Sequence, residues 1–172
     1  MTSLATLAAD LDALFGTRDH FTPVCLVVEA SHVPAADGVE ALATAIAAQA
    51  PREGWLWGDG GPRRLAPGAP LALPGRLFAA ELALTDGASL HVDHEDEGPG
   101  APAGWRLVRY AEAAGEPTHL AERVLHVSTL KDGTGRFATG LVYRRYWRAQ
   151  AGEPARTVAA RFLGFEGLGE EG

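Results

Sequence analysis

The clearest structural pattern in the chain is in residues 76–94, which read RLFAAELALTDGASLHVDH. In an extended chain the first ten residues alternate, and one face carries Phe78, Ala80, Leu82 and Leu84. An Asp-Gly pair follows at 86–87, and such a pair between two alternating runs is typical of a tight hairpin turn. The returning residues 88–94 place Leu90 and Val92 on one face. The stretch therefore predicts a β-hairpin with one apolar face.

Upstream of the hairpin, two segments have helical spacing. Residues 3–15 carry leucines three and four positions apart, with Ser3 placed to cap the helix at its N-terminus. Asp37, followed three residues later by Glu40, forms a capping-box pattern, which predicts a second helix beginning near Val39.

Strands are predicted for most of the remaining chain. Residues 24–28, VCLVV, form a continuous apolar run that predicts a buried strand with Cys25 as a small core residue. The Pro-rich segment 58–74 is predicted to hold neither a central strand nor a helix. Further strands are predicted at residues 55–57, 105–111, 124–130, 141–148 and 157–165. We expect an α+β fold with two N-terminal helices packed on a mostly antiparallel, meandering β-sheet.

Composition supports one soluble domain spanning residues 1–172. The chain is 47% hydrophobic and 22% charged, and a chain of 172 residues can bury a core without metal or disulfide staples. Its single cysteine excludes an internal disulfide and a four-cysteine zinc site. The first fifteen residues contain no Lys or Arg, unlike a secretory signal, and no apolar run approaches membrane-spanning length, so we expect a cytoplasmic protein without a membrane segment.

Charge is distributed unevenly along the chain, whose net charge is −7. Residues 105–165 contain nine Arg and Lys131 against five acidic residues, a balance of +5, whereas residues 1–104 carry −9. Such asymmetry favours contact with a polyanion or with a charged protein surface. Arg-rich composition from a GC-rich genome is the competing explanation.

No segment has the spacing of a known catalytic or metal-binding motif. Residues 91–95, HVDHE, contain ligand types, but on a strand His91 and Asp93 share one face and His94 lies on the other. A solvated acidic strand end is therefore the better interpretation. Apolar neighbours also argue against Cys25 as a nucleophile. We expect no enzyme activity, no cofactor and no metal.

Residues 143–148, YRRYWR, interleave arginines with aromatic rings on both faces of a strand. This pattern suits single-stranded RNA, whose phosphates attract cations and whose bases stack on rings. The predicted surface for RNA or an acidic partner comprises Arg144, Arg145, Tyr146, Trp147 and Arg148. Alternatively, one ring-bearing face belongs to the core and the arginines extend to water or pair with acidic residues.

Several short motifs resemble those of a known family. They are Trp57-Gly58, Arg76-Leu77-Phe78 with Glu81-Leu82, Gly104-Trp105, and Tyr146 followed by Gly152-Glu153 and Arg161-Phe162-Leu163. In this order they resemble the small accessory protein of type III-D CRISPR effector complexes, over residues 55–165. The resemblance implies a noncatalytic subunit of an RNA-guided antiviral complex that contacts other protein subunits and RNA.

A second class of function stays open. It is a small cytosolic enzyme, or a β-rich domain that binds a small ligand, with a site assembled from separate strands. A pocket that gathers His91, His119 or His126 with carboxylates would favour it.

Overall fold

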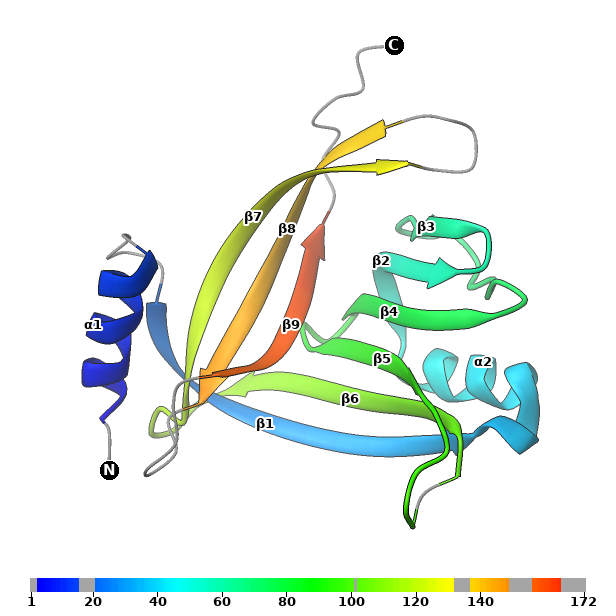
Figure 1. Cartoon of the computed structure of the whole chain (residues 1–172), viewed down its shortest axis with the longest axis horizontal. Helices are drawn as coiled ribbons and strands as arrows, with labels where there is room; N and C mark the ends of the chain where they lie inside the picture. Colours follow the sequence, from blue (N-terminus) through cyan, green and yellow to red (C-terminus); the bar gives the residue numbers. More distant parts are fainter. Residues whose placement is uncertain (1–2, 16–20, 101, 132–136, 149–155, 165–172) are drawn as a thin grey trace.

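The computed structural model describes residues 3–15, 21–100, 102–131, 137–148 and 156–164 (Figure 1). Its helices are α1 (Leu4–Phe15), the short 3-10 helix η1 (Ala35–Asp37) and α2 (Gly38–Ala48). Its strands are β1 (Phe21–Pro34), β2 (Pro51–Gly58), β3 (Gly61–Leu65), β4 (Leu77–Leu84), β5 (Ser89–Glu95), β6 (Gly104–Ala113), β7 (His119–Lys131), β8 (Phe137–Arg148) and β9 (Arg156–Gly164). The predicted α+β class with a mostly antiparallel sheet and two helices is confirmed.

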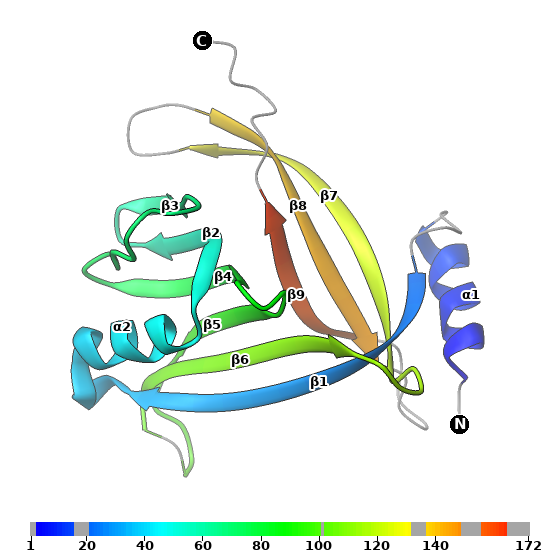
Figure 2. The same ribbon diagram turned by 180° about the vertical axis from the view of Figure 1, so that it is seen from behind.

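The strands form one sheet with the order β3-β2-β4-β5-β6-β1-β7-β8-β9. Strands β4 to β6 and β7 to β9 are each a simple meander, and β1 lies between the two groups. Residues Cys25–Pro34 of β1 pair with β6, whereas only Phe21–Val24 pair with β7. The two groups of strands therefore diverge from β1, and the sheet curves so that β9 approaches β4 and β5 (Figures 1 and 2).

The predicted hairpin is present as β4 and β5. The backbone N–H of Leu84 donates to the carbonyl of Ala88 at 2.8 Å, which closes a loop of three residues. Gly87 has a φ of +87°, and a carboxylate oxygen of Asp86 accepts from the N–H of Ala88 at 3.0 Å. The Asp-Gly pair thus forms this turn because glycine accepts a positive φ and aspartate bonds to the backbone two residues ahead.

Alternation along β4 changes at one residue. Ala80, Leu82 and Leu84 are buried as predicted, but Phe78 is 44% exposed and Leu77 is buried instead. The pairing with β2 passes from Ala79 directly to Leu77, so Phe78 lies at a bulge. An extra residue in a bulge shifts the side-chain period by one position, which is why the predicted face was wrong at Phe78.

The two helices contact different clusters of buried residues. Leu42 and Ile46 of α2 are fully buried in the main core, which also contains Leu82, Leu90, Val92 and Leu107. Leu7 and Leu11 of α1 pack in a separate cluster with Phe21, Leu120 and Trp147. The core is thus divided between the two groups of strands.

Capping differs between the helices. The Ser3 hydroxyl accepts from the backbone N–H of Thr6 at 3.1 Å, so the predicted N-cap of α1 is confirmed. Asp37 makes no side-chain capping bond, because it belongs to η1 and has helical backbone angles rather than the extended ones of a capping residue. The capping-box interpretation was wrong, although the start of α2 was placed within one residue.

One strand prediction needs correction. The run at residues 24–28 is not a buried strand: Val27 and Val28 are 47% and 42% exposed, and Cys25 is only partly buried. The cause is that β1 leaves β7 after Val24, so its outer side is uncovered. The Pro-rich segment contains β3, which lies at the edge of the sheet and so agrees with the prediction that this segment holds no central strand. Within the described residues, no helix is long and apolar enough to cross a membrane.

Candidate functional site

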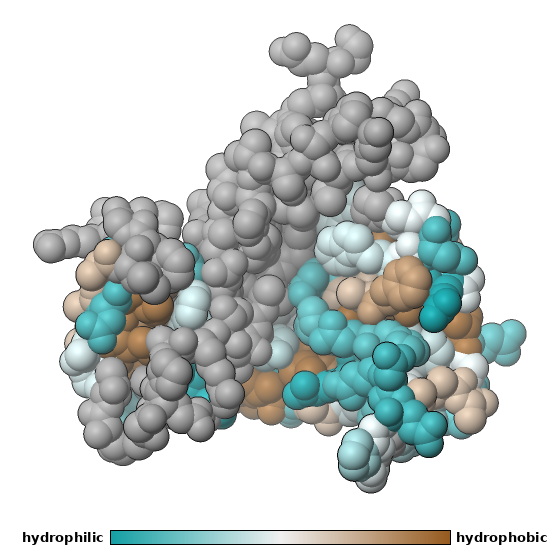
Figure 3. Space-filling view, viewed as in Figure 1, coloured by the Kyte–Doolittle hydropathy of each residue, from teal (hydrophilic) through white to brown (hydrophobic). Residues whose placement is uncertain are grey.

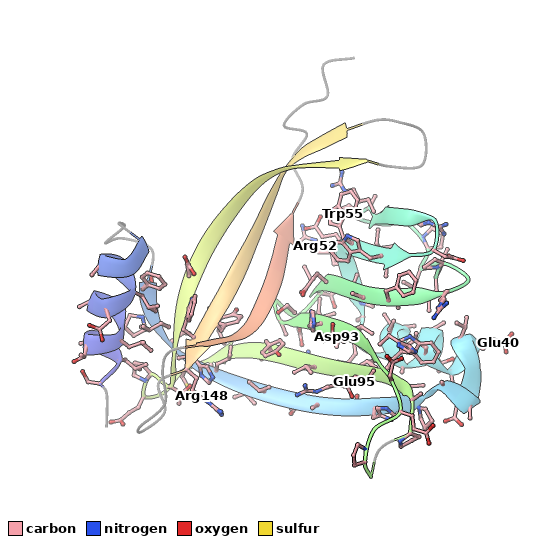
Figure 4. The ribbon with its side chains drawn as sticks, in the orientation of Figure 1. Glu40, Arg52, Trp55, Asp93, Glu95 and Arg148 are labelled. Atoms are coloured by element: carbon pink, nitrogen blue, oxygen red, sulfur yellow. The ribbon has the colours of Figure 1, made fainter. Side chains whose placement is uncertain are left out.

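Glu81 on β4 and His91 and Asp93 on β5 form a cluster of charged side chains. The hairpin register places Glu81 directly opposite His91. One ring nitrogen of His91, Nδ1, contacts a Glu81 carboxylate oxygen, and the other, Nε2, lies 2.7 Å from an oxygen of Asp93. His91 and Asp93 share a face, as predicted. Asp93 is labelled on β5 in Figure 4.

These contacts set the charge of His91. Burial disfavours the charged imidazole, but the hydrogen bond and charge of Glu81, with the charge and hydrogen bond of Asp93, outweigh it and raise the pKa of His91 to about 9. At neutral pH His91 therefore carries both ring protons and donates to a carboxylate on each side. In this state it has no lone pair with which to accept a proton or bind a metal ion.

Burial differs within the cluster. The side chains of Glu81, His91 and Asp93 are 12%, 25% and 45% exposed. Only Asp93 fits the predicted solvated strand end, and hydrophilic residues gather over β5 and the loop after it (Figure 3). Sequence reasoning missed Glu81, although counting back from the turn at Asp86 would have paired it with His91.

Ser89 lies two residues before His91, on the same face of β5. It is 1% exposed, and its hydroxyl oxygen is buried without a hydrogen-bond partner. Tyr110 on β6 lies opposite it in the register. Burial raises the pKa of Tyr110. Ser89 and Tyr110 are thus polar side chains on this face of the sheet with little exposure to water.

Two residues of the predicted RNA or partner surface are buried. Tyr146 is fully buried and stacks on Tyr110, and Trp147 is 6% exposed with its ring edge against Phe21. The Trp147 indole N–H donates to a carboxylate oxygen of Glu122 at 2.9 Å. Both rings are therefore in contact with the protein itself. The alternative expected one ring-bearing face of the strand in the core, whereas the adjacent residues Tyr146 and Trp147 are both buried, in different clusters.

Arg148 is the predicted site residue with an exposed side chain in the described part of the chain. It lies at the end of β8, far from Arg52 and Trp55 on β2 (Figure 4). Burial and the charge of Arg148 both lower the pKa of His119, whose Nδ1 lies 2.7 Å from the Thr118 hydroxyl. The groups that act on His119 are therefore Thr118 and Arg148, and they differ from those that contact His91.

The side chains of Arg144 and Arg145 lie outside the described residues, as does that of His126. The backbone register nevertheless fixes the positions of the arginines. Arg123 on β7 pairs with Arg144 on β8, and Arg144 pairs with Arg161 on β9. Three arginine positions from three strands therefore form one row across the sheet, which sequence reasoning did not foresee because it depends on the pairing of distant segments.

Comparison with known proteins adds no functional assignment: no family model, curated protein or solved structure matches the chain. Among the described residues, no group of three or more His, Cys, Asp or Glu side chains has an arrangement that could hold a metal ion.

Proposed function

We propose that the protein is a noncatalytic accessory or assembly subunit of a type III CRISPR RNA-guided effector complex, in which it contacts partner subunits and RNA. The observation that carries the RNA contact is the row of Arg123, Arg144 and Arg161 across β7, β8 and β9. Neighbouring strands are about 4.8 Å apart, so the row spans about 10 Å at the backbone.

Like charges placed directly opposite one another destabilise a sheet unless anions compensate them. Phosphate groups are suitable anions, since each guanidinium can donate two parallel hydrogen bonds to phosphate oxygens. The net charge of −7 repels RNA at long range, so the attraction is local to this row. The aromatic neighbours Tyr146 and Trp147 contribute by holding β8 rigidly in the core rather than by stacking on bases.

Filter binding of single-stranded RNA at several salt concentrations tests the contact. We expect affinity to fall with salt, and Arg144→Gln to weaken binding of all sequences alike and to reduce the slope of log affinity against log salt by about 0.7. Arg106→Gln is the matched control, because Arg106 is exposed on β6, which β1 separates from β7, β8 and β9 in the sheet, and should change neither quantity. Equal changes in affinity and in salt slope for the two variants, or no RNA binding by the wild type, would overturn the RNA contact.

Assembly is tested separately by co-expressing the chain with the tagged subunits and guide RNA of a type III effector from the same genome. Co-purification in a fixed ratio is expected. If the effector assembles completely while this chain elutes alone, the assignment to that complex is wrong.

The competing function, a small enzyme or ligand-binding domain, is favoured by a different observation. The Glu81–His91 pair joins two strands, and the buried Ser89 hydroxyl on the same face lacks a partner. A ligand that bonds to Ser89 would raise the melting temperature of the wild type but not of Ser89→Ala. A screen of small polar metabolites by thermal shift, with both proteins in parallel, separates this function from the proposed one.

A further inference from the structure

Strand β1 has an open edge along half of its length. After Val24 it has no strand partner opposite β6 within the described residues. Side chains 27–32 are all exposed, and Val27 and Val28 are two of the three exposed large hydrophobic residues described. Figures 1 and 2 show no helix or strand beside this edge between α1 and the loop that joins β5 to β6.

The direction of the backbone groups on this edge follows from two hydrogen bonds. The carbonyl of Val24 accepts from the N–H of Thr118, and the N–H of Leu26 donates to the Thr118 hydroxyl, so even-numbered residues point away from β6. Since N–H and C=O of one residue point to the same side of a strand, Val28, Ala30 and His32 present three donors and three acceptors outward.

Proteins usually protect such edges with lysine, proline or a bulge. Here the register with β6 is regular from Cys25 to Pro34, and Glu29 is the one acidic or basic residue, apart from His32, in the exposed stretch. Its carboxylate lies 3.9 Å from Arg109 on β6. The edge therefore has no bulge over this stretch, and its outward backbone groups can pair with another strand.

We propose that a second copy of this chain pairs with this edge, strand β1 against strand β1, about a two-fold axis at Ala30. In this antiparallel register Val28 pairs with His32 of the other copy and Ala30 pairs with itself, so all six outward groups are bonded. Glu29 then lies opposite Ser31 rather than opposite a second Glu29, and no like charges face each other.

The ends of the pairing also match. In the same register Leu26 would face Pro34, and neither can donate a bond, because the Leu26 N–H is already used by Thr118 and proline has no N–H. The open edge therefore ends at a Leu26–Pro34 pair at each end of the two-stranded pairing. A shift by two residues would place Glu29 opposite Glu29 or leave outward groups without partners.

Cross-linking tests the register. In a background of Cys25→Ser, Ala30→Cys should form a disulfide-linked dimer under mild oxidation, because paired Cα atoms are about 5.5 Å apart in such a pair. Val28→Cys is the matched control: its two copies would be about 14 Å apart, so it should not cross-link. Equal cross-linking of both variants, or of neither, would overturn the proposed pairing.

Sedimentation of the wild type over a range of concentrations tests the association itself. Dimer formation should increase with concentration and with salt, since salt screens the repulsion between two copies of charge −7. Ala30→Pro, which removes one outward N–H, and Val28→Lys should both remain monomeric. A wild type that is monomeric throughout overturns the proposal. RNA binding weakens with salt, so the two proposals fail independently.

Discussion

The ring of Tyr146 on β8 stacks on the ring of Tyr110 on β6, with centroids 6.1 Å apart and planes inclined by 20°. These strands are separated in the sheet by β1 and β7, so the stacking joins the two groups of strands across the curve of the sheet. The Tyr146 hydroxyl also donates to a carboxylate oxygen of Glu112 at 3.1 Å. Leu26, Val108 and Ala121 complete the cluster around them.

Removal of the Tyr146 ring should therefore destabilise the fold. Tyr146→Ala is expected to lower the free energy of unfolding by about 3–5 kcal/mol, because it empties a fully buried site. Tyr146→Phe keeps the ring and should cost only about 1 kcal/mol for the lost hydrogen bond. Urea unfolding measures both, with Phe78→Ala at an exposed site as the control. Equal small effects of all three variants would contradict the role of the Tyr146 ring.

Stability should depend on pH through His91. Its pKa is about 9 in the folded protein and near 6.5 in an unfolded chain, so the folded state binds the proton more tightly. The stabilisation is fully present below about pH 6.5 and is lost as pH rises through about 9. The difference in unfolding free energy between wild type and His91→Gln should therefore shrink over this range.

Urea unfolding would measure that difference at about pH 6, 7.5 and 9. These values sample the range between the pKa of His91 in the unfolded chain and its pKa in the folded protein. Ser31→Ala, which removes no titrating group, should differ from wild type by a constant amount. A difference for His91→Gln that is equally constant would mean that His91 is not held as an ion pair by Glu81 and Asp93.

The turn at Gly87 should tolerate alanine poorly. Its φ of +87° lies in the left-handed region, and a Cβ there would meet no other atom, so backbone strain alone sets the cost. We expect Gly87→Ala to lower the free energy of unfolding by about 1 kcal/mol. Gly60→Ala is the control, because Gly60 has equal space and no positive φ. If thermal and urea unfolding are the same for both variants, the turn is not strained.

The two helix starts should respond differently to loss of their polar residues. Ser3→Ala removes a capping bond to the Thr6 N–H and should cost about 1 kcal/mol, seen as faster amide exchange in α1. Asp37→Ala removes no such bond and should lose only the few tenths of a kcal/mol of a charge near a helix N-terminus. Equal protection losses in α1 and α2 would contradict this assignment.

Part of the candidate site could be predicted from the sequence. Alternation placed His91 and Asp93 on one face and His94 on the other, where it meets the Trp105 ring edge-on at 5.8 Å. It did not reveal that Glu81 belongs to the same cluster. The sequence left open whether one ring-bearing face of residues 143–148 belongs to the core or to a binding surface, because such a strand has the same sequence in both cases. It did not indicate that Tyr146 and Trp147 are both buried.

Features that depend on a few adjacent residues could be predicted from the sequence: the hairpin at Asp86–Gly87, the capped helix α1, and the positions of most strands. Turn and cap chemistry act within four or five residues, so local sequence is sufficient. Which strands are neighbours is known only from the folded sheet, and the open edge of β1, the arginine row and the raised pKa of His91 follow from it. Each depends on segments that are distant in the chain and that meet only when the sheet assembles.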